Sequence, residues 1–227
     1  MKRLIHVAFL ILIFPVFLIA GSQEKGLANF RDDDLAQRYA LVIVQDDSIP
    51  AKPERLLYRM ARGKHENDGE ILKIAYHVVW PFEKDSRKGF YSWWTRVTYT
   101  GGLKLQKIIY GPGDVEGIEL TVDAESGKVI KVVYETADWD EKGRVIHVPM
   151  EETGAEIPSD HQLVFRVVSW NHMFDLISES EVKEEPRYEL VPEYFSEELW
   201  HYYSMTKKKQ TPLKRDRAHF EWEVEAG

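Results

Sequence analysis

Tyr110-Gly-Pro-Gly-Asp114-Val-Glu116-Gly117-Ile-Glu-Leu-Thr-Val-Asp123 is a turn rich in glycine and proline that runs directly into an alternating segment. Apolar residues occupy the even positions, Ile118, Leu120 and Val122, and polar residues occupy the odd positions, Glu119 and Thr121. Successive side chains of a β-strand point to opposite faces of its sheet. The alternation therefore predicts a β-strand whose even face meets a core and whose odd face meets water.

Two acids lie where the turn joins this strand. Extending the period of two backwards places Asp114 and Glu116 on the core-side face, at the open end of the strand. A desolvated carboxylate costs several kcal/mol unless a cation, an arginine or several donors compensate it, so the pair predicts a metal or a basic ligand. Gly117 leaves a second interpretation open, because a β-bulge there would shift the phase and turn both acids to solvent.

Strand-like patterns recur along the chain without a long helix between them. The clearest is Leu72–Trp80, in which His77 falls on the face opposite the apolar residues and is predicted to be a surface or inter-sheet histidine. Together these patterns predict an all-β fold, an antiparallel β-sandwich of about seven to nine strands. The predicted strands span residues 38–45, 72–80, 90–100, 103–110, 118–123, 129–136, 144–148, 163–168 and 219–224.

The sandwich domain is predicted to span residues 23–178, beginning with a loosely held polar arm over residues 23–34. Short capping helices are predicted at residues 52–62, 171–177 and 196–205. Residues 179–227 form a C-terminal extension that is too short to bury enough surface by itself and has no cysteine to stabilise it. The extension is expected to pack on the sandwich through Leu199, Trp200, Tyr202, Phe220 and Trp222.

Residues 1–22 read as a signal peptide. Lys2 and Arg3 give a positive start, the following stretch is mostly apolar, and Ala20-Gly21-Ser22 supplies small residues for cleavage. The protein is therefore predicted to be secreted or periplasmic, with an uncleaved membrane anchor as the alternative.

Composition narrows the classes of partner and chemistry. The 227 residues are 44% hydrophobic and 12% aromatic, which is enough for a sizeable core. The net charge of −8 argues against nucleic acid as a partner, and the absence of cysteine excludes disulfides and thiolate chemistry. The basic run at residues 207–217 is either a solvated segment or a peripheral contact with an anionic lipid surface.

Two segments carry a resemblance. Tyr76-His-Val-Val-Trp80-Pro-Phe-Glu-Lys-Asp85-Ser86 and Gly113-Asp114-Val-Glu116-Gly117 are similar to motifs of the secreted necrosis-inducing (cytolysin-like) proteins and of related vacuolar-sorting-type domains. The resemblance covers residues 38–176 and implies a sandwich whose acids surround a divalent cation that helps to receive a sphingolipid sugar head group. Asp114, Glu116 and Asp85 occupy the acidic positions.

The chain departs from that pattern at two positions. The motif histidine of the family corresponds to Gly111, and the aromatic residue between the two acids corresponds to Val115. An all-oxygen set of ligands would suit Ca²⁺ or Mg²⁺ better than Zn²⁺, although the loss of the histidine equally fits an inactive site.

Three function classes follow. The preferred one is an exported binding module that receives a sugar, a lipid head group or a peptide at Asp85, Asp114, Glu116 and His172, with Asp85, Asp114 and Glu116 as the metal ligands. The alternatives are a hydrolase that uses the same carboxylates as acid and base, and a structural envelope protein without a ligand. The sequence contains no nucleophile elbow, phosphate-binding loop or histidine-rich metal motif, which favours binding over catalysis.

Overall fold

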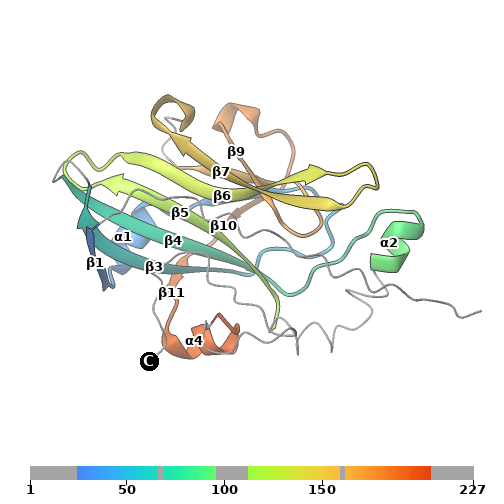
Figure 1. Ribbon diagram of the computed structural model, residues 1–227, viewed down its shortest axis with the longest axis horizontal. Helices are drawn as coiled ribbons and strands as arrows, with labels where there is room; N and C mark the ends of the chain where they lie inside the picture. The colour runs from blue at the N-terminus through green and yellow to red at the C-terminus, as the bar shows by residue number, and fades with distance from the viewer. Residues whose placement is uncertain (1–24, 66–68, 96–111, 159–161, 206–227) are drawn as a thin grey trace, which may run out of the picture.

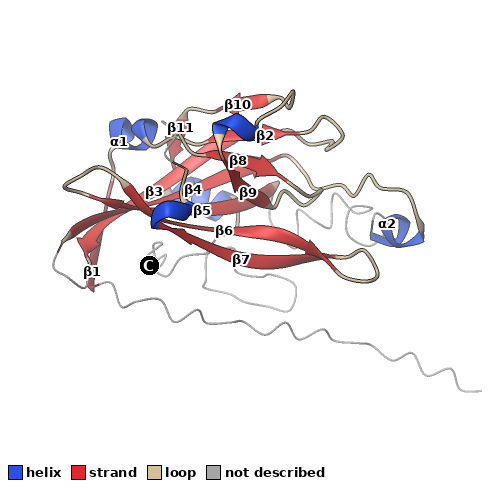
Figure 2. Ribbon diagram, turned by 90° about the horizontal axis from the view of Figure 1, so that it is seen from above, coloured by secondary structure: helices blue, strands red, loops and turns tan. Residues whose placement is uncertain are grey.

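The computed structural model describes residues 25–65, 69–95, 112–158 and 162–205. Within these residues the chain forms two mostly antiparallel β-sheets that pack face to face, with only short helices at the periphery (Figures 1 and 2). The predicted all-β sandwich is confirmed. The signal peptide, the strands expected at residues 103–110 and 219–224, and the basic run at residues 207–217 lie outside the described residues.

The larger sheet has the strand order β1-β3-β4-β5-β6-β7, and β11 pairs with β3 beside β1. Neighbours are antiparallel except for β11, which runs parallel to β3. Its strands are β1 (Lys25–Phe30), β3 (Arg55–Lys64), β4 (Glu70–Trp80), β5 (Asp114–Asp123), β6 (Val129–Trp139), β7 (Val145–Thr153) and β11 (Pro192–Tyr194).

The smaller sheet has the order β10-β2-β8-β9, and β2 and β8 are its parallel pair. Its strands are β2 (Val42–Gln45), β8 (Val164–Val167), β9 (Phe174–Ile177) and β10 (Arg187–Glu189). The helical elements are α1 (Asp33–Arg38), α2 (Phe90–Thr95), α4 (Glu197–Tyr202) and the 3₁₀ turns η2 (Gly154–Glu156) and η3 (Glu179–Glu181). None of the described helices has the length and apolar character needed to cross a membrane.

The main core lies between the sheets. The even residues of β4 and β5 face it and meet aromatic side chains of the smaller sheet, including Phe165 and Phe174. The pairing of β4 with β5 runs without a register shift from Ile71↔Asp123 to Trp80↔Asp114. The predicted inward face of residues 118–122 is therefore confirmed.

The opposite face of the larger sheet is not the water-facing surface that the alternation predicts. Glu119 and Thr121 are buried, and the Glu119 carboxylate accepts a hydrogen bond from the ammonium group of Lys73 at 2.6 Å. His77 is also buried, with its ring edge-on to Phe195 at 5.0 Å. The predicted exposure of this face was wrong. Alternation shows only which face of a strand is more apolar, and the ion pair between Lys73 and Glu119 allows the more polar face to be buried as well.

Two predicted helices are strands. Residues 52–62 were expected to be helical because Leu56, Leu57 and Met60 fit a helical spacing, but β3 occupies Arg55–Lys64. This strand is buried on both faces, so its apolar run lacks the alternation that marks a half-exposed strand. Residues 171–177 instead contain a turn followed by β9, which pairs with β8.

Three other expectations differ from the structure. The arm over residues 23–34 contains β1 and the start of α1. The strand is possible there because an edge strand is held by its main-chain pairing with β3 and needs no apolar pattern. The strand expected from residue 90 begins instead as α2, where Trp93 N–H donates to the carbonyl of Gly89. The first expected strand also starts later, at Val42, because Arg38 ends α1.

The described part of the C-terminal extension belongs to both sheets. β10 pairs with β2 and β11 pairs with β3, after which α4 lies on the outer face of the larger sheet (Figure 1). The helix expected at residues 196–205 is confirmed as α4, whose Trp200 side chain is buried against Phe195. Leu199 is half-buried and Tyr202 is exposed, whereas Phe220 and Trp222 lie outside the described residues.

Candidate functional site

Asp114 and Glu116 begin β5 on its core-side face. Their side chains are nearly buried, with residue exposures of 4% and 9%. The pairing of β5 with β4 passes through His77↔Gly117 without a shift, so no bulge resets the phase at Gly117. Both acids therefore point inward, as the period of two predicts.

The local geometry explains why these acids stand at an open end. β5 pairs with β6 only from Glu119 to Val122 among the described strands, so β6 does not pair with the first residues of β5. Gly113 enters β5 with φ of +75°, and a Cβ atom there would lie 2.5 Å from the carbonyl oxygen of Trp80. Only glycine fits this turn without displacing the end of β4.

Glu83 joins the two strand acids. One ligand atom from each of Glu83, Asp114 and Glu116 can be chosen so that all three lie within 4.8 Å of one another. We call these three residues the acidic triad. Glu83 follows the end of β4, and Trp80 at that end is the register partner of Asp114. Sequence reasoning missed Glu83, because it lies in the loop after β4, where no regular period indicates which side chain turns toward β5.

Asp85 has a different partner. Its carboxylate accepts hydrogen bonds from Arg87 Nε and Nη2, each at 2.9 Å, and from the Arg87 backbone N–H at 3.0 Å. Burial raises the pKa of the Asp85 carboxyl, but the hydrogen bonds from Arg87 and Ser92 outweigh burial and hold this pKa below its usual value. Arg87 in turn donates to the carbonyl of Gly143 at 3.0 Å and lies over the Trp139 ring. Asp85 thus connects the loop after β4 to the β6–β7 hairpin and is not part of the triad.

His172 lies directly against the triad. Its Nδ1 is 2.6 Å from Asp114 Oδ2, and its ring stacks on Trp80 with centroids 4.3 Å apart. The Trp80 indole is fixed in turn by donating Nε1–H to Gln45 Oε1 at 2.9 Å. The structure thus brings together Asp114, Glu116 and His172, which the sequence analysis assigned to one ligand-binding set. His172 contacts the carboxylate through Nδ1, which orients Asp114 as an outer-shell partner orients a metal ligand.

The turn that carries His172 contains several buried polar atoms. Across the described residues no hydrogen-bond partner reaches Trp170 Nε1, Asn171 Oδ1 or His172 Nε2. Asn171 Nδ2 is 2.9 Å from His147 Nε2, and His147 Nδ1 is 2.7 Å from Glu135 Oε2. A buried polar atom without a protein partner is ordinarily satisfied by water or a ligand. The turn therefore carries an indole N–H donor, an amide oxygen acceptor and an imidazole nitrogen without a described partner, and the imidazole belongs to the ring that contacts Asp114.

The triad has the chemistry of a site for a hard cation. Carboxylate oxygens are the ligands that Ca²⁺ and Mg²⁺ prefer, and three carboxylates this close repel one another unless positive charge or protons compensate them. Three protein ligands leave coordination positions open for water or for oxygen atoms of a ligand. The residues present thus fit Ca²⁺ or Mg²⁺, with Glu83 in the position that the sequence assigned to Asp85.

Neither protein-family models, nor curated proteins, nor solved structures give a match to this chain. The resemblance to the necrosis-inducing proteins stays a hypothesis. What the site does is therefore inferred from its geometry.

Proposed function

We propose that the protein is an exported binding module that holds Ca²⁺ or Mg²⁺ at Glu83, Asp114 and Glu116 and receives a polar ligand at that cation. The observation that carries the proposal is the convergence of the three acids at a mostly buried end of the sandwich. A bound cation would present open coordination positions to oxygen atoms of a sugar, a lipid head group or a peptide.

The surroundings of the triad support a binding role. Trp80 and His172 form a stacked pair beside Asp114, and the turn of His172 carries polar atoms that no described residue satisfies. A ligand with several hydroxyl or carbonyl groups could bond both to the cation and to this turn. Rings that are held in place by packing and hydrogen bonds are typical of a preformed binding site.

Thermal unfolding with added Ca²⁺, with Mg²⁺ and with EDTA tests the cation. Because a ligand that binds only the folded state stabilises it, Ca²⁺ at about 100 times its Kd should raise the melting temperature by roughly 5 to 10 °C. Glu83→Gln and Glu116→Gln should each abolish this rise, since each removes a charged ligand.

Asp85→Asn is the matched control. This variant should melt at a lower temperature than the wild type, because it loses the contacts with Arg87, yet it should keep the rise with Ca²⁺. Two results would refute the cation site: indifference of the wild-type protein to both ions and to EDTA, or a rise that survives in Glu83→Gln and Glu116→Gln.

A further inference from the structure

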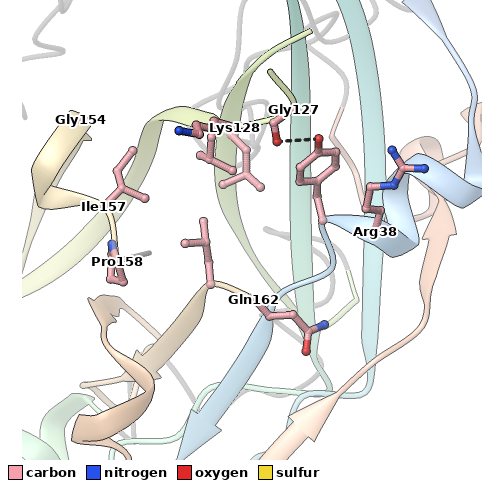
Figure 3. Close-up of a pocket in the computed structure, with 11 residues that line it drawn as sticks. Arg38, Gly127, Lys128, Gly154, Ile157, Pro158 and Gln162 are labelled. Atoms are coloured by element: carbon pink, nitrogen blue, oxygen red, sulfur yellow. Dashed lines mark hydrogen bonds between the residues drawn. The ribbon is translucent and has the colours of Figure 1, made fainter. Parts of the chain in front are cut away.

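A second site lies at the other end of the sandwich. A cavity of about 570 Å³ opens there between the two sheets, within the range of roughly 300–1,000 Å³ that is usual for small-molecule pockets (Figure 3). Leu120 of β5 lines it, and six residues of extended strand, roughly 20 Å at ~3.4 Å per residue, separate Leu120 from Asp114. The cavity is therefore distinct from the acidic triad.

The interior of the cavity is apolar. Leu120 and Val129 line it from the larger sheet, Leu163 lines it at the start of β8, and Ile157 lines it after η2. Figure 3 shows Ile157 on the side of the opening opposite Arg38, and Tyr39 also lines the cavity. Such walls favour the aliphatic or aromatic body of a ligand, since burying apolar surface is worth roughly 25 cal/mol per Å².

The rim is cationic. Arg38 and Lys128 line the cavity and are solvent-exposed, and neither makes an ion pair with an acid in the described residues. Among the described residues that line the cavity none is acidic, although the chain as a whole has a net charge of −8. Two cations at the mouth of an apolar cavity are complementary to a ligand with one negative end.

The other polar side chains at the cavity already have partners. The Tyr39 hydroxyl donates a hydrogen bond to the carbonyl of Gly127 at 3.0 Å, and Gln162 Nε2 donates to the carbonyl of Ala40 at 3.4 Å (Figure 3 shows the first). The Tyr39 bond also ties the segment after α1 to the β5–β6 hairpin, which holds the mouth in shape. Arg38 and Lys128 are thus the groups that remain for recognising a polar head.

We propose that this cavity binds an amphiphilic anion, a molecule with an apolar body and a carboxylate, phosphate or sulfate head. The body would lie among Leu120, Val129, Ile157 and Leu163, and the head would remain at the rim in the field of Arg38 and Lys128. The inference does not rest on the cation site, because the two sites share no residue.

Calorimetric titration with four small probes tests the proposal. Octanoate and octyl phosphate carry both features, whereas 1-octanol lacks the charge and acetate lacks the apolar body. The two anionic amphiphiles should bind saturably with one site per chain, and 1-octanol and acetate should bind at least about tenfold more weakly. A preference between the carboxylate and the phosphate identifies the head group.

Charge-removing variants locate the contact. The double variant Arg38→Gln/Lys128→Gln, called the rim variant, should weaken the binding of octanoate about tenfold, which is the effect of losing two exposed charge contacts of roughly 0.7 kcal/mol each. The binding of 1-octanol should be unchanged. Each single variant shows which cation contributes more. Lys64→Gln/Lys142→Gln removes the same net charge from exposed sites outside the cavity lining and should leave octanoate binding as it is in the wild type.

Two further variants define the cavity itself. Ile157→Trp, which adds bulk to the wall, should weaken octanoate and 1-octanol alike, whereas Asp114→Asn at the distant triad should change neither. Saturable binding in wild type that is lost in the rim variant supports the site. The proposal is overturned if octanoate fails to bind at millimolar concentration, if 1-octanol binds as well as octanoate, or if the rim variant matches the lysine control.

Discussion

Asp85 and Glu83 lie two residues apart in one loop, yet only Glu83 belongs to the acidic triad. The loop after Trp80 has no regular period, so the sequence cannot indicate which of its acids turns toward β5. Asp114 and Glu116 could be placed because they continue the period of a strand, and that period extends only as far as regular pairing does. What decides the position of Asp85 is a contact with Arg87, which no spacing rule reveals.

This arrangement predicts an acid-dependent contribution from Asp85. Its pKa lies below the usual value of 3.8 in the folded protein, so its ionised form stabilises the fold above about pH 4, and this contribution is lost as the pH falls through the folded pKa. Asp85→Asn should therefore be less stable than the wild type in urea unfolding at pH 7, and the difference should shrink at pH 3.

Asp47→Asn is the control for that comparison. Asp47 is exposed and pairs with Lys52 at the surface, so its replacement should change the free energy of unfolding by less than about 0.5 kcal/mol at either pH. A difference between Asp85→Asn and the wild type that is as large at pH 3 as at pH 7 would show that the Asp85 carboxylate does not act through its charge.

The strands that the sequence predicts well are those with one face much more apolar than the other, such as β4 and β5. The sequence pattern does not predict β3, because Leu56 and Leu57 are both buried: Leu56 faces the core and Leu57 lies under α4. The sequence pattern also does not predict short edge strands such as β1 and β11, because main-chain pairing with β3 holds them and requires no apolar alternation. For these elements the tertiary context overrides local pattern.

α4 provides a test of how the outer face is covered. The Trp200 side chain is 2% exposed and packs against Phe195 at 4.8 Å and His77 at 5.9 Å, whereas Tyr202 on the same helix is 60% exposed. Trp200→Ala should lower the free energy of unfolding by about 3 to 5 kcal/mol, because it leaves a large cavity. Chemical denaturation measures the change.

Tyr202→Ala is the matched control on the same helix, and its effect should stay within about 0.5 kcal/mol. If both substitutions lower the free energy of unfolding by the same small amount, α4 does not stabilise the sheet through its buried face. If Tyr202→Ala lowered the free energy of unfolding more than Trp200→Ala, α4 would not pack on the sheet through Trp200.

The molecule as a whole has two ends of opposite character. Three acids converge where β5 begins. Beyond the middle of the same strand, Arg38 and Lys128 lie at the rim of an apolar cavity. Because both arise along β5, the strand that the alternating sequence identifies also organises the two sites. The sandwich supplies a rigid separation between them, so a ligand at one end need not disturb the other.

Terbium luminescence is the most direct test of the proposal that the acidic triad holds a divalent cation. Tb³⁺ replaces Ca²⁺ at oxygen sites, and its emission rises when it binds beside an excited indole. Trp80 is the register partner of Asp114, so excitation of the protein should sensitise Tb³⁺ emission at the triad. We expect a saturable emission that excess Ca²⁺ suppresses. Glu83→Gln and Glu116→Gln should abolish this emission, and Asp85→Asn should retain it. Emission that is absent from the wild-type protein, or equal in all four proteins, would contradict the proposal.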